Sequence, residues 1–158
     1  MVHHSLRHYN NGHYLLIENA STYEEARTIA LDVLKSMPKS IAIVCGPIST
    51  GGVGNVTDNL KIYENTIFKL STQNKNIFNQ MPFMKAFDII TKKFGNTKEE
   101  KNQILLDKFY LPIYESGLIT KMYFIHGWES SHGARWERKV AQKNNIIIED
   151  LPKNFLEQ

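Results

Sequence analysis

The stretch of sequence that decides the fold reads Met122-Tyr-Phe-Ile125 and continues as Gly127-Trp-Glu-Ser-Ser-His-Gly-Ala-Arg-Trp-Glu-Arg-Lys-Val-Ala141. The first part has the apolar character of a buried strand. The second part opens a helix, because the hydroxyl of Ser130 or Ser131 can accept free backbone N–H groups of a first helical turn. A strand that leads directly into a helix is the repeating unit of an α/β fold.

Glu137 lies on the side of this helix that should face a sheet. It shares that side with Gly133 and Ala141 at helical spacing. A buried carboxylate costs free energy unless something pairs with it. Two interpretations follow. Glu137 is a rim residue that reaches solvent or bonds an arginine such as Arg135 or Arg138, or it serves a ligand site at the C-terminal end of a strand, where open α/β sheets bind ligands.

Strand-like and helix-like segments alternate along the rest of the chain. Strands are predicted at 13–18, 41–45, 76–79, 121–125 and 145–148. Helices are predicted at 22–37, with Ser21 or Thr22 as the cap, at 57–70, 81–94, 98–108 with a kinked continuation over 109–116, and 131–143. This order predicts an α/β, three-layer Rossmann/flavodoxin-like domain, with a mainly parallel sheet of about four to five strands and helices on both faces. Right-handed crossovers should bring the loops at 46–55 and 127–133 to the same edge of that sheet.

The 158 residues are expected to form a single domain. Residues 1–12 are predicted to be a flexible N-terminus, 13–40 an N-terminal extension of one strand and one helix, and 41–148 the core. Four of six histidines fall in the first thirteen positions (His3, His4, His8 and His13). Their spacing fits no metal-ligand pattern, so we expect neither a metal site nor a cofactor.

The composition limits the classes of partner and the cellular compartments that fit this sequence. The net charge is +3 with both signs interspersed, which argues against a nucleic acid polymer as partner and suits a small anionic ligand. The apolar runs are too short for a membrane span. Cys45 is the single cysteine, which excludes an internal disulfide and fits a reducing compartment. We therefore expect a cytoplasmic protein.

The loop after the 41–45 strand is rich in glycine and hydroxyl residues. Gly46, Ser49, Thr50, Gly51 and Gly52 precede the next helix, and backbone N–H groups in such a loop can cradle a phosphate. Neither the dinucleotide-binding glycine pattern nor a P-loop lysine is present. Taken alone, a glycine-rich loop of this kind is usually only a turn.

Taken together, Cys45-Gly-Pro-Ile-Ser-Thr-Gly-Gly52 and Ser131-His-Gly-Ala-Arg-Trp-Glu137 resemble the two signatures of the nucleoside 2-deoxyribosyltransferase superfamily. The family includes transferases and deoxynucleoside 5'-monophosphate N-glycosidases, and the resemblance spans about residues 41–148. It implies that Glu137 is the nucleophile and that Ser131 and Gly133 bind a phosphate or 5'-group. It also implies a homodimer or larger homo-oligomer.

The serine at position 131 favours a nucleotide over a nucleoside. A serine hydroxyl at a helix N-terminus can donate to a phosphate, whereas the aspartate of the nucleoside transferases would repel it. The implied mechanism is attack by Glu137 on the anomeric carbon through an oxocarbenium-like transition state. The helix N-terminus is expected to keep Glu137 ionised.

The chain departs from the family pattern where an acidic residue should help hold the sugar or protonate the base. No aspartate stands at 111–115, so Tyr114 and Glu115 are the accessory candidates there. Trp128 is a candidate for stacking on a base, and Glu129 for an acid or ligand contact.

Three functions remain open from the sequence. The first is a nucleotide or nucleoside N-glycosidic-bond hydrolase or deoxyribosyltransferase. The second is a non-catalytic nucleotide- or sugar-phosphate-binding domain, which would keep both loops and would not need Glu137. The third is a structural or partner-binding protein on the same fold.

Overall fold

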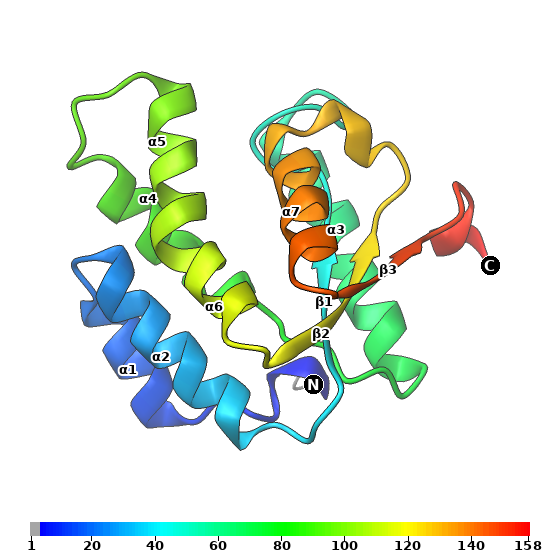
Figure 1. The fold of residues 1–158 in the computed structure, drawn as a ribbon, viewed down its shortest axis with the longest axis horizontal. Helices are drawn as coiled ribbons and strands as arrows, with labels where there is room; N and C mark the ends of the chain where they lie inside the picture. The colour runs from blue at the N-terminus through cyan, green and yellow to red at the C-terminus, as the bar shows by residue number, and fades with distance from the viewer. Residues whose placement is uncertain (1–3) are drawn as a thin grey trace.

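The computed structural model describes residues 4–158 and shows an α/β fold around a parallel sheet (Figure 1). Its strands are β1 (Ile41–Cys45), β2 (Ile119–Phe124) and β3 (Ile147–Asp150), in the order β1-β2-β3. Cys45 pairs with Phe124, and Phe124 pairs with Asp150. The carboxyl ends of the three strands are therefore aligned at one edge, from which the loops predicted to hold the site leave.

The sheet has three strands among the described residues, fewer than the four to five predicted. The predicted strand at 13–18 is wrong, because these residues lie in helix α1 (Asn11–Asn19). Asn10 begins the helix with a capping box, in which its side chain accepts the N–H of His13 and the His13 ring accepts the N–H of Asn10. His13 and Ile17, four positions apart, are the buried residues of this helix.

The segment predicted as a strand at 76–79 reaches the sheet at one point only. Ile77 forms an isolated parallel bridge with Ala42 of β1, with hydrogen bonds of 2.8 Å from Ala42 N to Asn76 O and from Phe78 N to Ala42 O. The chain then turns into a 3-10 helix at Met81, which prevents further pairing.

The helices agree with the predicted ranges to within a few residues. They are α2 (Tyr23–Ser36), α3 (Val56–Thr72), α4 (Met84–Thr91), α5 (Lys98–Leu105), α6 (Leu111–Glu115) and α7 (His132–Lys143), with 3-10 turns η1 (His4–Leu6), η2 (Met81–Phe83), η4 (Trp128–Ser130) and η5 (Phe155–Glu157). Thr22 and Ser131 cap α2 and α7 as predicted.

The kinked continuation of α5 is confirmed, and it takes the form of the π-helical turn η3 (Leu106–Tyr110), which leads into α6. Pro112 has no N–H to donate to the carbonyl four residues earlier, on Lys108. That carbonyl instead accepts a hydrogen bond of 3.0 Å from the Arg27 guanidinium of α2. The irregular turn is thus satisfied by a neighbouring helix.

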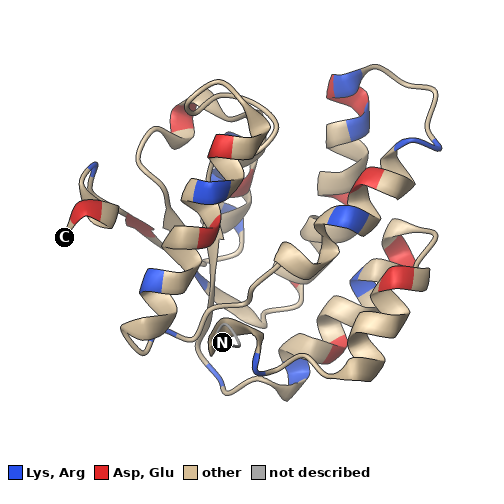
Figure 2. Ribbon diagram, turned by 180° about the vertical axis from the view of Figure 1, so that it is seen from behind, with Lys and Arg blue, Asp and Glu red and all other residues tan. Residues whose placement is uncertain are grey.

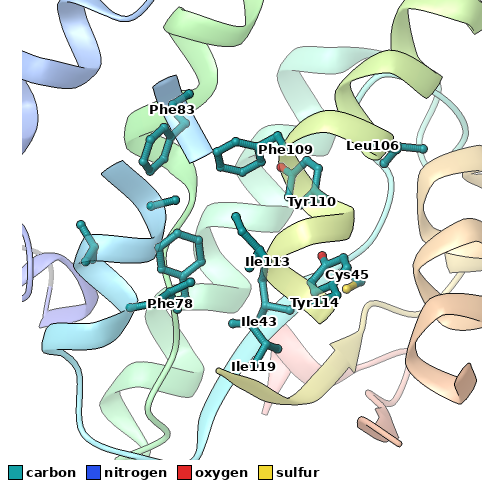
Figure 3. Close-up of a cluster of buried hydrophobic side chains, with 14 of the residues drawn as sticks. Ile43, Cys45, Phe78, Phe83, Leu106, Phe109, Tyr110, Ile113, Tyr114 and Ile119 are labelled. Carbon is teal, nitrogen blue, oxygen red and sulfur yellow. The ribbon is translucent and has the colours of Figure 1, made fainter. Parts of the chain in front are cut away.

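Helices cover both faces of the sheet. On one face, Tyr63, Ile67 and Leu70 of α3 pack with Ala42 and Val44 of β1. The larger cluster on the other face is shown in Figure 3. It joins β1 and β2 to helices α2, α4, α6 and α7 through buried side chains that include Ile43, Cys45, Phe83, Phe109, Ile113, Tyr114, Ile119 and Ala141.

Both ends of the described chain are docked on the body. In the segment predicted to be flexible, Ser5 and Tyr9 are buried, and the Tyr9 hydroxyl donates to the Asn79 carbonyl at 2.5 Å; His3 lies outside the described residues. At the other end, the Lys69 ammonium of α3 lies 4.8 Å from the ring centre of Phe155. Within residues 4–158, no helix combines the length and apolarity that crossing a membrane requires.

Candidate functional site

The two loops singled out in the sequence lie against each other, which confirms their predicted meeting at one sheet edge. The Gly52 N–H donates to Ser130 Oγ at 2.8 Å, and the His132 N–H donates to Thr50 Oγ1 at 3.2 Å. Gly51 has a φ of +70°, and a Cβ there would lie 2.3 Å from the Ser130 carbonyl oxygen. Only glycine permits this approach, so Gly51 fixes the contact between the loops.

A cavity of about 630 Å³ opens beside this pair of loops. One wall comes from the sheet edge and the other from the helical segment between α3 and α6. Six of the residues predicted for the site line it: Gly46, Ser49, Thr50, Ser131, Gly133 and Glu137. The structure thus places the predicted carboxylate and most of the predicted binding residues in one cavity.

Glu137 is buried, with 8% of its surface exposed. The Tyr114 hydroxyl and the Cys45 thiol both donate to its Oε2 atom, the thiol at 3.3 Å. Figure 3 shows Cys45 and Tyr114 next to each other, one from β1 and one from α6. Oε1 accepts no hydrogen bond from the described residues. One oxygen of the carboxylate is therefore held by the protein, and the other is open to a ligand.

The rim interpretation of Glu137 is wrong. Arg138 forms an ion pair with Asp150 at 2.6 Å, and Arg135 donates to the backbone carbonyl of Glu129 at 2.6 Å. Both guanidinium groups are thus engaged away from the cavity.

Burial raises the pKa of the Glu137 carboxyl to about 7, although the hydrogen bonds from Tyr114 and Cys45 act in the opposite direction. The expectation that the helix N-terminus keeps Glu137 ionised is therefore wrong. Glu137 lies in the second turn of α7, and the field of a helix terminus fades beyond the first turn. Near neutral pH the carboxyl is divided between its charged and neutral forms.

The first turn of α7 offers one unused donor to the cavity. The Ala134 N–H donates to Ser131 Oγ at 3.2 Å, and the His132 N–H is taken by Thr50. The N–H of Gly133 has no hydrogen-bond acceptor among the described residues. A Cβ on Gly133 would meet nothing closer than 3.9 Å, so the space in front of this N–H is open.

Gly51 and Gly52 do not line this cavity, although they were predicted to bind phosphate. Their role in the structure is to hold the loop. A Cβ on Gly52 would lie 2.3 Å from Oδ1 of Asn59, whose Nδ2 donates to the carbonyl oxygens of Ile48 and Gly51 at 3.1 Å each.

Of the four accessory candidates, only Tyr114 contacts Glu137. Glu115 is exposed at the end of α6, because its neighbour Tyr114 takes the inward position. Trp128 packs on Phe124 and under the Arg138 guanidinium, 4.3 Å from its ring centre, so it is not presented to the cavity. Glu129 is exposed and borders a different hollow.

A buried polar chain at the cavity was missed in the sequence. The Tyr110 hydroxyl donates to Oε1 of Gln80, Nε2 of Gln80 donates to the Tyr63 hydroxyl, and Tyr63 donates to the Val44 carbonyl. Burial raises the pKa of Tyr63 and Tyr110 well above that of free tyrosine. Gln80 directly follows the segment 76–79 that was predicted as a strand, and a polar residue in that position is the signal that could have found it.

No metal site emerges: within residues 4–158, no group of three or more histidine, cysteine, aspartate or glutamate side chains is placed to hold an ion. Comparison with known proteins adds no further constraint, since no protein-family model, curated protein or solved structure matches this chain. The assignment of function therefore depends on the geometry of the cavity.

Proposed function

We propose that this chain cleaves or transfers an N-glycosidic bond of a nucleotide or nucleoside, with Glu137 as the nucleophile. The observation that supports the proposal is the burial of Glu137 and the way its two carboxylate oxygens are engaged. Glu137 is a buried carboxylate, anchored through Oε2 by Tyr114 and Cys45, whose Oε1 is unengaged in a cavity that also contains Ser131 and Gly133. Burying most of a carboxylate while one of its oxygens faces a cavity without a protein partner is costly, and such groups concentrate at functional sites.

The proposed chemistry begins with attack of the Glu137 Oε1 lone pair on the anomeric carbon. As the C1'–O bond to Glu137 forms, the bond from C1' to the base nitrogen breaks, and its electron pair leaves with the base. Tyr114 and Cys45 hold the second oxygen, which limits rotation of the carboxylate during attack. Water then resolves the ester in a hydrolase, and a second base resolves it in a transferase.

The 5' end of the substrate is assigned to the start of α7. The free N–H of Gly133 and the hydroxyl of Ser131 are donors at a helix N-terminus, which favours an anion. This arrangement supports a nucleoside 5'-monophosphate as the preferred substrate.

One observation favours the second candidate, a non-catalytic nucleotide-binding domain. Apart from Glu137, the only carboxylate that lines the cavity among the described residues is Asp88, which is exposed and paired with Lys92 at 3.1 Å. A buried second carboxylic acid to protonate the leaving base is thus missing from the described lining. A base that leaves as a stabilised anion, or one that is protonated by solvent, would be needed for turnover.

The proposal also includes a three-layer fold, a homo-oligomeric assembly and a cytoplasmic location. Helices on both faces of a parallel sheet support a three-layer Rossmann/flavodoxin-like assignment. Leu15 and Leu16 of α1 are 62% and 58% exposed, and this apolar surface supports a homodimer or larger homo-oligomer. The cytoplasm remains the proposed compartment.

The test is chromatographic detection of free base after incubation with ribo- and deoxynucleosides and their 5'-monophosphates. Wild type should release base, and Glu137→Gln should be slower by about a thousandfold or more, since loss of a nucleophile removes the covalent route. The rate should rise as pH passes through about 7, because only the ionised carboxylate attacks. Glu115→Gln makes the same chemical change at an exposed site and should keep the wild-type rate.

Two results would decide against the enzyme. If wild type releases no base from any member of the panel, yet wild type and Glu137→Gln bind a nucleotide equally well, the binding domain is the correct function. If nothing nucleotide-like binds, both candidates fail, and the structural or partner-binding alternative remains.

A further inference from the structure

Helix α5 stands across the cavity from the two loops and is tied to both. The Lys98 ammonium donates to the Ser49 carbonyl oxygen at 3.3 Å, and Nε2 of His132 lies 3.2 Å from Oε1 of Gln103. Figure 1 shows α5 and α7 on opposite sides of this part of the molecule. The helix therefore closes the cavity on the side that faces the start of α7.

One side of α5 is directed to the cavity, and its composition is unusual for a packing face. Lys98, Lys101, Asn102 and Leu105 line the cavity at helical spacing, with the two cations at the outer end and the leucine at the inner end. None of the α5 residues is fully buried. Leu105 packs against the core, whereas Lys98, Lys101 and Asn102 are polar, so core packing does not explain the outer part of this face.

The two lysines that line the cavity have no carboxylate partner among the described residues, as is true of most lysines of the chain. Lys92, Lys108 and Lys121 each form an ion pair at 3.1–3.2 Å. Asp88, the exposed carboxylate of the cavity, is already paired with Lys92. Figure 2 shows from behind that charged positions of both signs lie at the start of α5. Two positive charges therefore border the cavity, and neither forms an ion pair with a carboxylate of residues 4–158.

We propose that Lys98 and Lys101 recognise a phosphate monoester, which lies between α5 and the start of α7. This inference rests on the proposed nucleotide ligand and specifies how it is selected. A phosphate monoester carries a charge of about −1.5 to −2 at neutral pH, which two ammonium groups match. The Gly133 N–H and the Ser131 hydroxyl face the same cavity and supply donors from the opposite wall.

The placement also separates the phosphate from the carboxylate. Lys98 and Lys101 are at the outer turn of α5, whereas Glu137 is buried with Cys45 at the end of β1. A nucleotide with its phosphate between the lysines and its sugar toward Glu137 avoids placing two anions side by side. α5 therefore distinguishes 5'-monophosphates from uncharged nucleosides.

The experiment compares Lys98→Gln/Lys101→Gln with Lys85→Gln/Lys139→Gln, which removes the same charge from exposed positions that do not line the cavity. Binding to the full chain is measured by calorimetry with inorganic phosphate, the common 2'-deoxynucleoside 5'-monophosphates and the matching nucleosides. The first pair should weaken 5'-monophosphate binding about tenfold, as expected for two exposed ion pairs, and leave nucleoside binding unchanged. The control pair should bind as wild type does.

Equal 5'-monophosphate affinity in both double variants would overturn the inference, and so would an equal loss for nucleosides and monophosphates. Failure of the proposed function has a different signature. Base release from nucleosides without any role for the lysines would keep the enzyme and remove this inference. Lysine-dependent nucleotide binding without base release would keep the inference and remove the enzyme.

Discussion

The two walls of the cavity differ in how their side chains are held. On the sheet wall, Gly46 directly follows β1, Ser131 caps α7, and the Glu137 side chain reaches the end of β1 from the second turn of α7. Hydrogen bonds between the two loops fix the backbone there. On the helical wall, Lys98 and Lys101 project from a helix without a buried residue. The rigid wall suits groups that must meet a reacting atom, and the helical wall suits groups that select a ligand by its charge.

The helical wall is supported by the aromatic part of the larger core cluster. The Phe109 ring lies 4.6 Å from Phe87, 4.9 Å from Tyr110 and 5.3 Å from Phe83, measured between ring centres. Tyr110 from the same π-helical turn lines the cavity. Packing of this cluster thus sets the position of the helical wall.

The largest expected effect is the loss of that packing. Phe109 is fully buried, so Phe109→Ala should lower the free energy of unfolding by about 3–5 kcal/mol through lost burial and an unfilled cavity. Urea denaturation followed by circular dichroism measures the change. Ile89→Ala on α4, which removes a side chain that is 47% exposed, should cost under about 1 kcal/mol. Similar losses in the two variants would mean that the aromatic cluster does not hold the helical wall.

A second prediction isolates the carboxylate of the sheet wall without any assay of activity. The pKa of Glu137 is raised in the folded chain, from 4.5 to about 7, so the folded state binds the proton more tightly than the unfolded state does. Its contribution to stability is complete below about pH 4.5 and is lost as pH rises through about 7. The loss should be about 3 kcal/mol, and Glu137→Gln should not show it.

Urea midpoints of wild type and Glu137→Gln, measured from pH 4.5 to 8.5, provide the comparison. As pH rises across this range, wild type should lose stability relative to Glu137→Gln. Glu115→Gln controls for the loss of an exposed carboxylate, because it should track wild type at every pH. A constant difference between wild type and Glu137→Gln would show that the folded chain does not perturb this carboxyl.

The smallest expected effect concerns the contact that joins the two loops. Gly51→Ala adds a Cβ that would lie 2.3 Å from the Ser130 carbonyl oxygen, in a residue with a φ of +70°. The expected cost is about 1–3 kcal/mol, measured by urea denaturation. Gly54 has a φ of +95° and open space around its Cβ position, so Gly54→Ala supplies the backbone strain without the clash. Equal costs at the two positions would mean that loop contact contributes nothing.

Sequence patterns predicted the parts of this fold that local chemistry decides. The apolar run 41–45, the caps at Thr22 and Ser131 and the inward side of α7 are each read within a few residues. Parallel strand order then brought the two loops together, because that rule does not depend on side-chain detail. The position of Glu137 followed from helical spacing alone.

The rest depends on partners that are distant in the sequence. Tyr114 and Cys45 converge on one oxygen of Glu137 only after α6 packs beside β1, so neither the contact nor the raised pKa can be read locally. Gln80 acquires its two tyrosine partners in the same way. The prediction of a strand at 13–18 was wrong because the spacing of its apolar residues fits a helix as well as a strand. The contact that decides for the helix is the capping box of Asn10 and His13.

The pairing of β1 with β2 has a consequence for how the chain assembles. Helices α3 to α6 all lie between β1 and β2 in the sequence, and yet the two strands are neighbours in the sheet. Contacts between residues so far apart in the sequence require the chain to lose loop-closure entropy before the contacts can stabilise it, and this slows folding. Until β2 has paired with β1, the two loops that border the cavity are on stretches of the chain that do not contact each other. Ligand binding can therefore appear only after β2 has paired with β1, and a ribosome-bound chain that lacks α7 contains β1 without a complete site.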